Sequence, residues 1–318
     1  MRKNILGNTG LEVTPVGFGV LTIGKTQLNM SVEDGSAVLK YALECGINFL
    51  DTAQYYDTYH YIKHALKGTN FDPVITSKCL DSSYSQMKYA VEQARKEMDR
   101  DVIDIFLLHE VRNDPDWDYR KGAWEYLQEA KVKGIVKAIG VSTHHVDVAE
   151  KAAAIKELDV IFPLINFNSL GIRKGNESGT KDEMAAAIKK NSDNGKGVFT
   201  MKVFGGGNLT GHYIEALDYV TALSGVSSMM IGFGYNYEID RIIEYIDGNI
   251  DRSYAPDITN KKIHIDEGDC ENCGACIKKC PNNAISFNEN GAASVNHGVC
   301  LTCGYCAPVC PVRAIIMF

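Results

Sequence analysis

The sequence of 318 residues lacks the features that mark membrane and nucleic-acid-binding proteins. No uninterrupted apolar run approaches the roughly 18–20 residues of a spanning helix, and the opening Met-Arg-Lys-Asn leads into no apolar signal segment. No stretch is rich in lysine and arginine, and the formal net charge is −7 at pH 7. We therefore expect a soluble cytoplasmic protein that binds neither nucleic acid nor an anionic membrane.

Cysteine is nearly absent before Cys270 and abundant after it. Eight of the ten cysteines lie between Cys270 and Cys310, in two runs with the spacing C-x2-C-x2-C-x3-C-P. Scattered cysteines in a small secreted chain are typical of disulfides, whereas clustered thiols in a cytosolic protein are typical of metal sites. This spacing is that of two-cluster ferredoxins, in which the fourth cysteine of each run binds the other cluster.

The two cysteine runs thus predict two [4Fe–4S] clusters. The first is expected on Cys270, Cys273, Cys276 and Cys310, and the second on Cys300, Cys303, Cys306 and Cys280. Zinc is the alternative, although four-cysteine zinc sites usually consist of two separated C-x2-C pairs. The segment 263–318 resembles bacterial 2[4Fe–4S] ferredoxins, which implies a small α+β domain stabilised largely by its clusters. The polar segment 251–262 before it is predicted to be a linker.

Residues 1–250 alternate short apolar runs with longer amphipathic ones, eight of each. Runs this apolar suit parallel strands that are buried on both faces, and the length is that of a (β/α)8 TIM barrel. Strands are expected at Val16–Gly19, Asn48–Asp51, Val74–Lys78, Ile103–His109, Val136–Val141, Val160–Phe167, Gly197–Lys202 and Ser228–Ile231. Helices are expected at Ser31–Cys45, Tyr59–Lys67, Ser85–Met98, Tyr119–Lys133, Val146–Glu157, Lys181–Asn194, Tyr213–Ser224 and Tyr237–Asp247. An opening hairpin, Asn4–Leu6 with Leu11–Val13, would plug the barrel floor.

Four polar residues fall where an α/β barrel performs chemistry, at the carboxyl ends of its strands. Asp51, Lys78 and His109 end strands, and Tyr56 follows on the next loop. Tyrosine, with a pKa near ~10, is a poor acid at pH 7, and a nearby ammonium would lower that pKa. The aspartate would hold the lysine, and the histidine would orient a carbonyl oxygen. This set predicts carbonyl reduction with Tyr56 as the proton donor.

Plainer interpretations of the same residues remain open. Asp51 and Lys78 could form a structural ion pair, and Tyr55 or Tyr59 could be the active tyrosine. The four motifs nevertheless resemble those of the aldo-keto reductase family over roughly residues 1–249. They read Asp51-Thr-Ala-Gln-Tyr-Tyr56, Ile75-Thr-Ser-Lys78, Asp104-Ile-Phe-Leu-Leu-His109 and Ile139-Gly-Val-Ser142.

The resemblance implies an NAD(P)H-dependent reduction of an aldehyde or ketone by the tetrad Asp51, Tyr56, Lys78 and His109. It also implies an extended nicotinamide cofactor across the top of the barrel. Positions carried over for that cofactor are Gly19, Asp51, Ser142, Thr143, Met201, Lys202, Gly205, Gly207, Leu209, Phe233 and Glu238. The resemblance places Ser142, Thr143 and Met201 at the nicotinamide, the loop Gly205–Gly211 around the pyrophosphate, and Ile231–Glu238 along the adenosine ribose. Departures at Leu164, Met201 and Phe233, where relatives have Gln, Tyr and Lys, leave NADPH versus NADH open.

The cysteine-rich segment complicates this function, because hydride transfer moves two electrons at once and an iron–sulfur cluster moves one. The clusters could be structural, or could pass electrons to a redox partner protein. The alternative function is therefore an electron-transfer protein whose barrel is a nucleotide-binding or docking scaffold without carbonyl turnover. In the reductase, the substrate pocket is expected between the loops Glu110–Asp118 and Ser169–Thr180 and the loop after the first strand.

Overall fold

The computed structural model describes residues 1–25, 27–257, 262–280, 282–300 and 304–317. Eight parallel strands close into a barrel in the cyclic order β3-β4-β5-β6-β7-β8-β11-β12, so the predicted (β/α)8 fold is confirmed. The strands are β3 (Val16–Gly19), β4 (Phe49–Asp51), β5 (Val74–Cys79), β6 (Ile103–Leu108), β7 (Val136–Thr143), β8 (Val160–Pro163), β11 (Gly197–Thr200) and β12 (Ser228–Ile231).

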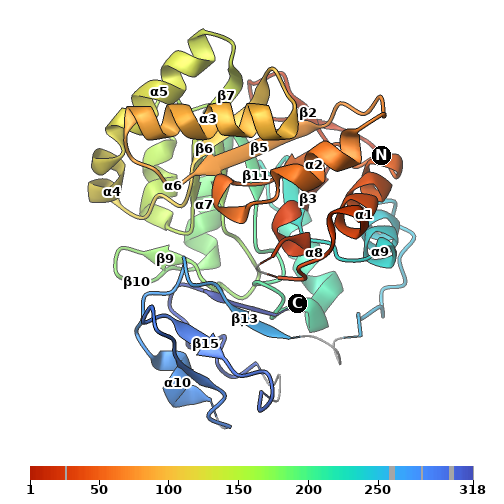
Figure 1. The fold of residues 1–318 in the computed structure, drawn as a ribbon, viewed down its shortest axis with the longest axis vertical. Coiled ribbons are helices and arrows are strands. Elements are labelled where there is room, and N and C mark those ends of the chain that lie inside the picture. Colours follow the sequence, from red (N-terminus) through yellow and green to blue (C-terminus); the bar gives the residue numbers. More distant parts are fainter. Residues whose placement is uncertain (26, 258–261, 281, 301–303, 318) are drawn as a thin grey trace.

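Helices surround the barrel, as Figure 1 shows. They are α1 (Val32–Glu44), α2 (Tyr59–Leu66), α3 (Tyr84–Met98), α4 (Asp114–Tyr119), α5 (Lys121–Val132), α6 (Val146–Ala152), α7 (Lys181–Asp193), α8 (Tyr213–Thr221) and α9 (Asn236–Ile246), with short 3-10 turns at Val20–Ile23, Gln54–Tyr56 and Thr210–His212. Helix α1 begins after Ser31, whose hydroxyl accepts the Asp34 N–H at 3.0 Å, as the sequence predicts. In the described ranges, no helix is long and apolar enough to cross a bilayer.

The amino-terminal hairpin consists of β1 (Asn4–Ile5) and β2 (Glu12–Val13). Its apolar side chains Leu6, Leu11 and Val13 join the interior of the barrel, where they pack with a layer that includes Phe49 and Phe199. The hairpin therefore closes the floor of the barrel, the end opposite the carboxyl ends of the strands.

Two strands are shorter than expected, and three small elements come in addition. The strand expected through Phe167 ends at Pro163, and the one expected through Lys202 ends at Thr200. Beyond these ends only Leu164 and Met201 still pair. Helix α4 forms within the loop expected after β6, and a short hairpin, β9 (Arg173–Lys174) and β10 (Glu177–Ser178), forms within the loop after β8.

Among the described residues of the carboxyl-terminal domain there are two small antiparallel sheets and one helix. Strand β13 (Ile263–Ile265) pairs with β16 (Ile315–Met317), β14 (Ile285–Phe287) pairs with β15 (Ala293–Val295), and α10 spans Ala275–Lys279. The domain, blue in Figure 1, lies against one end of the barrel. That end is the mouth, since the Met317 N–H donates to the Gly206 carbonyl at 2.8 Å in the loop after β11.

Candidate active site and iron–sulfur domain

The four residues predicted as a catalytic tetrad lie together at the mouth of the barrel. The Lys78 Nζ contacts Asp51 Oδ1 at 2.6 Å and donates to the Thr52 carbonyl at 2.8 Å. The same ammonium lies 4.7 Å from the centre of the Tyr56 ring. The Tyr56 hydroxyl lies 3.5 Å from His109 Nε2. Three strand ends and the loop after β4 therefore converge on one small group of side chains.

The ion pair at the base of this group is buried, with side chains exposed by only 1% for Lys78 and 8% for Asp51. Burial lowers the pKa of Lys78, and the carboxylate of Asp51 opposes that shift. A buried ammonium with one carboxylate and one carbonyl as partners has a fixed position. Lys78 is thus held beneath the Tyr56 ring.

The pKa of Tyr56 departs from the expectation based on Lys78 alone. Burial raises this pKa well above its ordinary value, and the carboxylates of Asp51, Asp269, Asp266 and Glu110 raise it further. The expected lowering by the ammonium does not prevail, because desolvation and several negative charges act together. The phenol is therefore held in its protonated form.

His109 is held in its neutral form. Burial lowers its pKa well below 6.5, and the positive charges of Lys78, Arg120 and Lys202 lower it further. Its carbonyl accepts from Arg120 at 2.6 Å. Its Nδ1 is buried without a hydrogen-bond partner among the described residues. A neutral imidazole of this kind can donate one N–H to a substrate oxygen.

Several residues predicted to contact the nicotinamide lie at the same mouth. The Ser142 hydroxyl accepts the Glu110 N–H at 2.8 Å and keeps its own hydrogen for donation. The Thr143 hydroxyl instead donates to the Val111 carbonyl at 2.7 Å and accepts the His145 N–H at 2.9 Å. Gly19 leaves room above β3, since an added Cβ would meet nothing closer than 3.5 Å. This end of the site fits a nicotinamide, with Ser142 as its polar contact.

The predicted adenosine side has other local roles in this structure. Phe233 is buried and packs edge-on against Phe18, with ring centroids 5.4 Å apart. Glu238 accepts the Gly234 N–H at 2.7 Å and caps α9. Leu209 is buried, whereas Met201 is half-buried at the edge of the interior layer. Met201, which the resemblance places at the nicotinamide and not at the adenosine, is partly exposed just after the carboxyl end of β11.

The glycine loop after β11, predicted to wrap a pyrophosphate, contacts the carboxyl-terminal domain. Its residues Gly205, Gly206 and Gly207 all have positive φ angles, of 55°, 65° and 85°. A Cβ on Gly207 would lie 1.7 Å from the Met317 carbonyl oxygen, so only glycine permits this approach. Arg313 reaches the Gly205 carbonyl at 3.4 Å. The loop glycines therefore allow the carboxyl-terminal domain to dock. The docked domain covers the loop at which the pyrophosphate was predicted.

The first predicted set of cluster ligands is brought together. The thiols of Cys310, Cys270 and Cys273 act electrostatically on Cys276, and together with burial they raise its pKa. No three His, Cys, Asp or Glu side chains of the described residues converge closely enough for a single metal ion. A [4Fe–4S] cubane distributes its thiolates over four irons, so it does not require that convergence. These four cysteines fit one cluster.

The second set is described only in part, because Cys303 lies outside the described residues. Cys280, Cys300 and Cys306 belong to the same small core as the first set, with Ile263, Ile285 and Ala307. The Ala284 N–H donates to the Cys280 sulfur at 3.2 Å. Hydrogen bonds of this type stabilise a thiolate and tune a bound cluster.

Sequence reasoning missed a charged group that the carboxyl-terminal domain adds to the barrel mouth. Asp269, next to Cys270, lies 3.5 Å from the Lys202 ammonium. Burial and the negative charge of Asp269 raise the pKa of Glu110 to about 8. The only signal in the sequence is the acidic run Asp266-Glu-Gly-Asp269 before the first cysteine.

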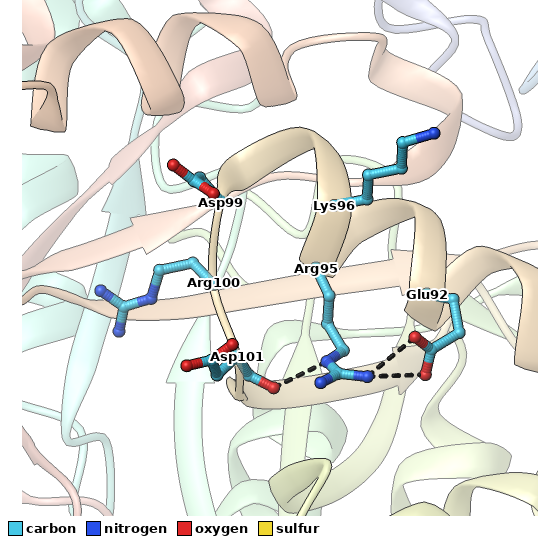
Figure 2. A pocket seen from close by; sticks show the side chains of 6 residues that line it. All are labelled: Glu92, Arg95, Lys96, Asp99, Arg100 and Asp101. Atoms are coloured by element: carbon cyan, nitrogen blue, oxygen red, sulfur yellow. Dashed lines mark hydrogen bonds and ion pairs between the residues drawn. The ribbon is translucent and has the colours of Figure 1, made fainter.

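A surface hollow elsewhere is unrelated to this site. It lies where α3 ends and the chain turns into β6, and its lining, drawn in Figure 2, is Glu92, Arg95, Lys96, Asp99, Arg100 and Asp101. Arg95 pairs there with Glu92 at 2.8 Å and donates to the Asp101 carbonyl at 2.6 Å. The hollow precedes a strand, so it opens at the floor end of the barrel, opposite the tetrad.

A parallel barrel with a buried ion pair, a phenol and an imidazole at its mouth, followed by a cysteine-rich domain, defines a class of barrel oxidoreductase with an iron–sulfur domain. Comparison with family models agrees in both parts. Residues 15–256 match the aldo/keto reductase family, and residues 263–317 match a 4Fe-4S dicluster domain. The chain belongs to the aldo/keto reductase family and carries a 4Fe-4S domain at its carboxyl end.

Individual relatives are distant. The chain is 25% identical over 217 residues to the uncharacterized oxidoreductase YqkF of Bacillus subtilis, which covers 64% of this chain and 68% of YqkF. It is 27% identical over 155 residues to L-galactose dehydrogenase of Arabidopsis thaliana, covering 45% of this chain and 49% of that protein. The structure of aldo-keto reductase AKR11C1 from Bacillus halodurans superposes with a TM-score of 0.64 at 21% identity, covering 78% and 91% of the two chains. The structural likeness supports the shared fold.

Proposed function

We propose that this protein reduces an aldehyde or ketone with NAD(P)H, and that Tyr56 is the proton donor. The observation that carries the proposal is the contact of the Tyr56 hydroxyl with His109 Nε2 at 3.5 Å, above the buried Lys78–Asp51 pair. A carbonyl oxygen placed between the phenol and the imidazole would meet two neutral donors. The bound nicotinamide would supply the hydride.

Each side chain of the tetrad has a separate task in this proposal. Tyr56 keeps its proton at neutral pH and releases it to the oxygen as negative charge develops there. Lys78, 4.7 Å from the centre of the Tyr56 ring, stabilises the resulting phenolate. Asp51 keeps the ammonium charged within a buried site. His109, neutral and held through its carbonyl by Arg120, orients the substrate oxygen.

The nicotinamide end of the cofactor would be held by Ser142, with Met201 covering its ring. NADH and NADPH are equal candidates, because this chain has Phe233 where relatives have a lysine. The two cysteine sets would each hold a [4Fe–4S] cluster that is structural or that serves a redox partner protein. L-galactose dehydrogenase suggests small hydroxy or oxo compounds as the first substrates to test.

One observation favours a second candidate function. Strand β16 and Arg313 contact Gly205, Gly206 and Gly207, where the family resemblance places the pyrophosphate. If the docked domain excludes the dinucleotide from this loop, the protein would be an electron-transfer protein whose barrel is a docking scaffold. The clusters of such a protein would exchange electrons with a redox partner protein, and the protein would bind no dinucleotide.

Titration of the anaerobically purified holoprotein with NADH and NADPH, followed by cofactor fluorescence, separates the two candidates. Iron and sulfide analysis on the same sample establishes the cluster content. The reductase predicts binding of one dinucleotide at submillimolar concentration and cofactor consumption with at least one compound of an aldehyde and ketone panel. Failure of both dinucleotides to bind while the clusters remain reducible would overturn the reductase.

A further inference from the structure

We propose that Asp269, carried by the iron–sulfur domain, is a positioning residue of the barrel's active site. It holds the Lys202 ammonium and the Glu110 carboxyl at the mouth, and it supplies negative charge that faces the tetrad. The active site is then complete only when the two domains are docked. This inference rests on the proposed function of Tyr56 and assigns to the cysteine-rich domain a role within the same reaction.

The first argument is the position of Asp269 between elements of the barrel. Its carboxylate lies 3.5 Å from Lys202 Nζ, and both side chains are largely covered, with exposures of 21% and 18%. Its negative charge also acts on Glu110, whose side chain is 12% exposed and pairs with Arg112 Nε at 3.1 Å. Asp269 therefore joins the loop after β6 to the loop after β11 across the mouth.

The second argument is the strained backbone of the two barrel residues that Asp269 contacts. Lys202 and Glu110 have left-handed φ angles of 57° and 53°, which are uncommon for residues other than glycine. Such conformations persist where the surroundings hold them, and they are frequent at functional sites. The Glu110 N–H is held by the Ser142 hydroxyl. Both side chains are thus turned toward the mouth by their loops and are met there by Asp269.

The third argument is the contact of the same acidic segment with the tyrosine pair. The Tyr55 hydroxyl packs on Gly268, where an added Cβ would lie 2.9 Å from it. Asp266 accepts the Gly268 N–H at 2.9 Å and fixes the turn that leads to Asp269. The segment therefore forms a wall against Tyr55, the residue before Tyr56.

The negative charges of this acidic segment act on the Tyr56 phenol. Its ring faces Asp51 from β4, Lys78 from β5, His109 from β6, and Glu110 from the following loop; Asp266 and Asp269 face it from the iron–sulfur domain. Lys202 acts on His109 from the loop after β11. Removing the Asp269 charge leaves Lys202 unpaired, and both changes favour the phenolate of Tyr56.

The test compares the pH profile of carbonyl reduction, as kcat/KM, for the holoprotein and for Asp269→Asn. We expect the basic limb of the profile, which reports Tyr56 in the free enzyme, to move to lower pH by about half a unit or more. Asp269→Glu, which restores the charge, should return the limb toward its original position. The visible absorbance of the iron–sulfur clusters should be the same in all three proteins, which shows that their cluster content is equal.

Two matched variants separate charge from docking. Glu289→Gln removes one negative charge from an exposed turn of the same domain, and its profile should coincide with that of the unmodified protein. Arg173→Gln removes the hydrogen bond of 3.2 Å to the Pro311 carbonyl, and so weakens docking without changing charge beside Tyr56. The other docking contacts, including the hydrogen bond from the Met317 N–H to the Gly206 carbonyl, should keep the domain docked, so the basic limb of this variant should remain in place.

An unchanged basic limb in Asp269→Asn, with clusters intact, would overturn the inference while leaving Tyr56 as the acid. An equal shift in Glu289→Gln would overturn it as well, because the effect would then be one of net charge. If Asp269→Asn loses its clusters, a Lys202→Gln variant gives the test from the barrel side: it removes the positive charge that Asp269 contacts, so the basic limb should move to higher pH, and an unchanged limb would overturn the inference. Failure of the proposed function is distinct, since the unmodified holoprotein would then reduce no carbonyl compound at all.

Discussion

The barrel and the carboxyl-terminal domain are stabilised in different ways. The barrel has one apolar core between strands and helices and a second inside the ring of strands. Among its described residues, the small domain has one core of a few aliphatic residues such as Ile263 and Ile315, packed with cysteines that we propose as cluster ligands. Apolar burial can fix the tetrad without a cofactor, whereas a domain this small depends on its metal centres. The barrel therefore supplies a preformed site, and the domain adds to that site only in its cluster-bound form.

Removal of the clusters should have the largest effect, because it should unfold the small domain and leave the barrel folded. After iron is removed by a chelator with a mild oxidant, residues 263–317 should lose most of their hydrogen-exchange protection, because cluster binding is coupled to folding. The barrel strands should keep theirs. Reconstitution with iron and sulfide is the control and should restore protection. Persistent protection of β13 and β16 in the iron-free protein would show that the domain folds without its clusters.

The buried ion pair of the barrel should tolerate little change. Lys78→Met leaves the Asp51 carboxylate buried without its partner, which should cost about 3–5 kcal/mol of the free energy of unfolding. The exposed pair of Lys25 and Asp57, at 2.8 Å, is the control. Its disruption in Lys25→Met should cost about 1 kcal/mol or less. Urea unfolding of the barrel measures both, and similar losses in the two variants would contradict a special role for burial.

Docking of the domains can be tested at one glycine. Gly207→Ala places a methyl group against the Met317 carbonyl and also strains a backbone with φ of 85°. Gly134→Ala introduces comparable strain at φ 69° with no atom within 4 Å. Strain alone costs about 1–2 kcal/mol, so both variants should lose that much. Only Gly207→Ala should also speed the hydrogen exchange of Ile315–Met317. Equal exchange in the two variants would contradict the docking contact.

The smallest expected effect is that of pH on reduction by the unmodified protein. The pKa of Tyr56 is raised above 10, so the phenol keeps its proton as the pH rises through that value. The pKa of His109 is lowered below 6.5, so the imidazole stays neutral as the pH falls through that value. We expect kcat/KM for reduction to be constant between pH 6.5 and 10. An essential group that titrates inside this interval would show that another residue is the acid or base.

Much of the barrel could be predicted from the sequence because its signals are local. Strands buried on both faces read as short apolar runs, and Asp51, Lys78 and His109 follow three of them directly. Helix α4 was missed because its exposed residues carry no apolar period and its start depends on a cap from Asn113 to the Asp116 N–H at 2.8 Å. The β9–β10 hairpin was missed because a bridge between His145 and Arg173, which are far apart in the sequence, supports it.

What the sequence could not provide is the meeting of the two domains. The cysteine spacing predicts the ligand sets, but nothing in it indicates that β16 joins the loop after β11. The glycines of that loop suggested a phosphate site, and the structure shows β16 against them. The direction of the Tyr56 pKa shift was also beyond reach, because it depends first on burial of the phenol and then on negative charges that include Asp269 and Asp266 of the distant domain. Local patterns fix elements, whereas charges that meet across domains require coordinates.

The central claim, that Tyr56 gives the proton, is tested most directly by substitution of the two neighbouring tyrosines. Single-turnover cofactor oxidation by the holoprotein with a carbonyl substrate would be compared with Tyr56→Phe and Tyr55→Phe. For Tyr56→Phe we predict a rate that is lower by a factor of about one hundred or more, with unchanged cofactor affinity. For Tyr55→Phe we predict a rate within a few-fold of that of the unmodified protein. Full activity of Tyr56→Phe would contradict the account.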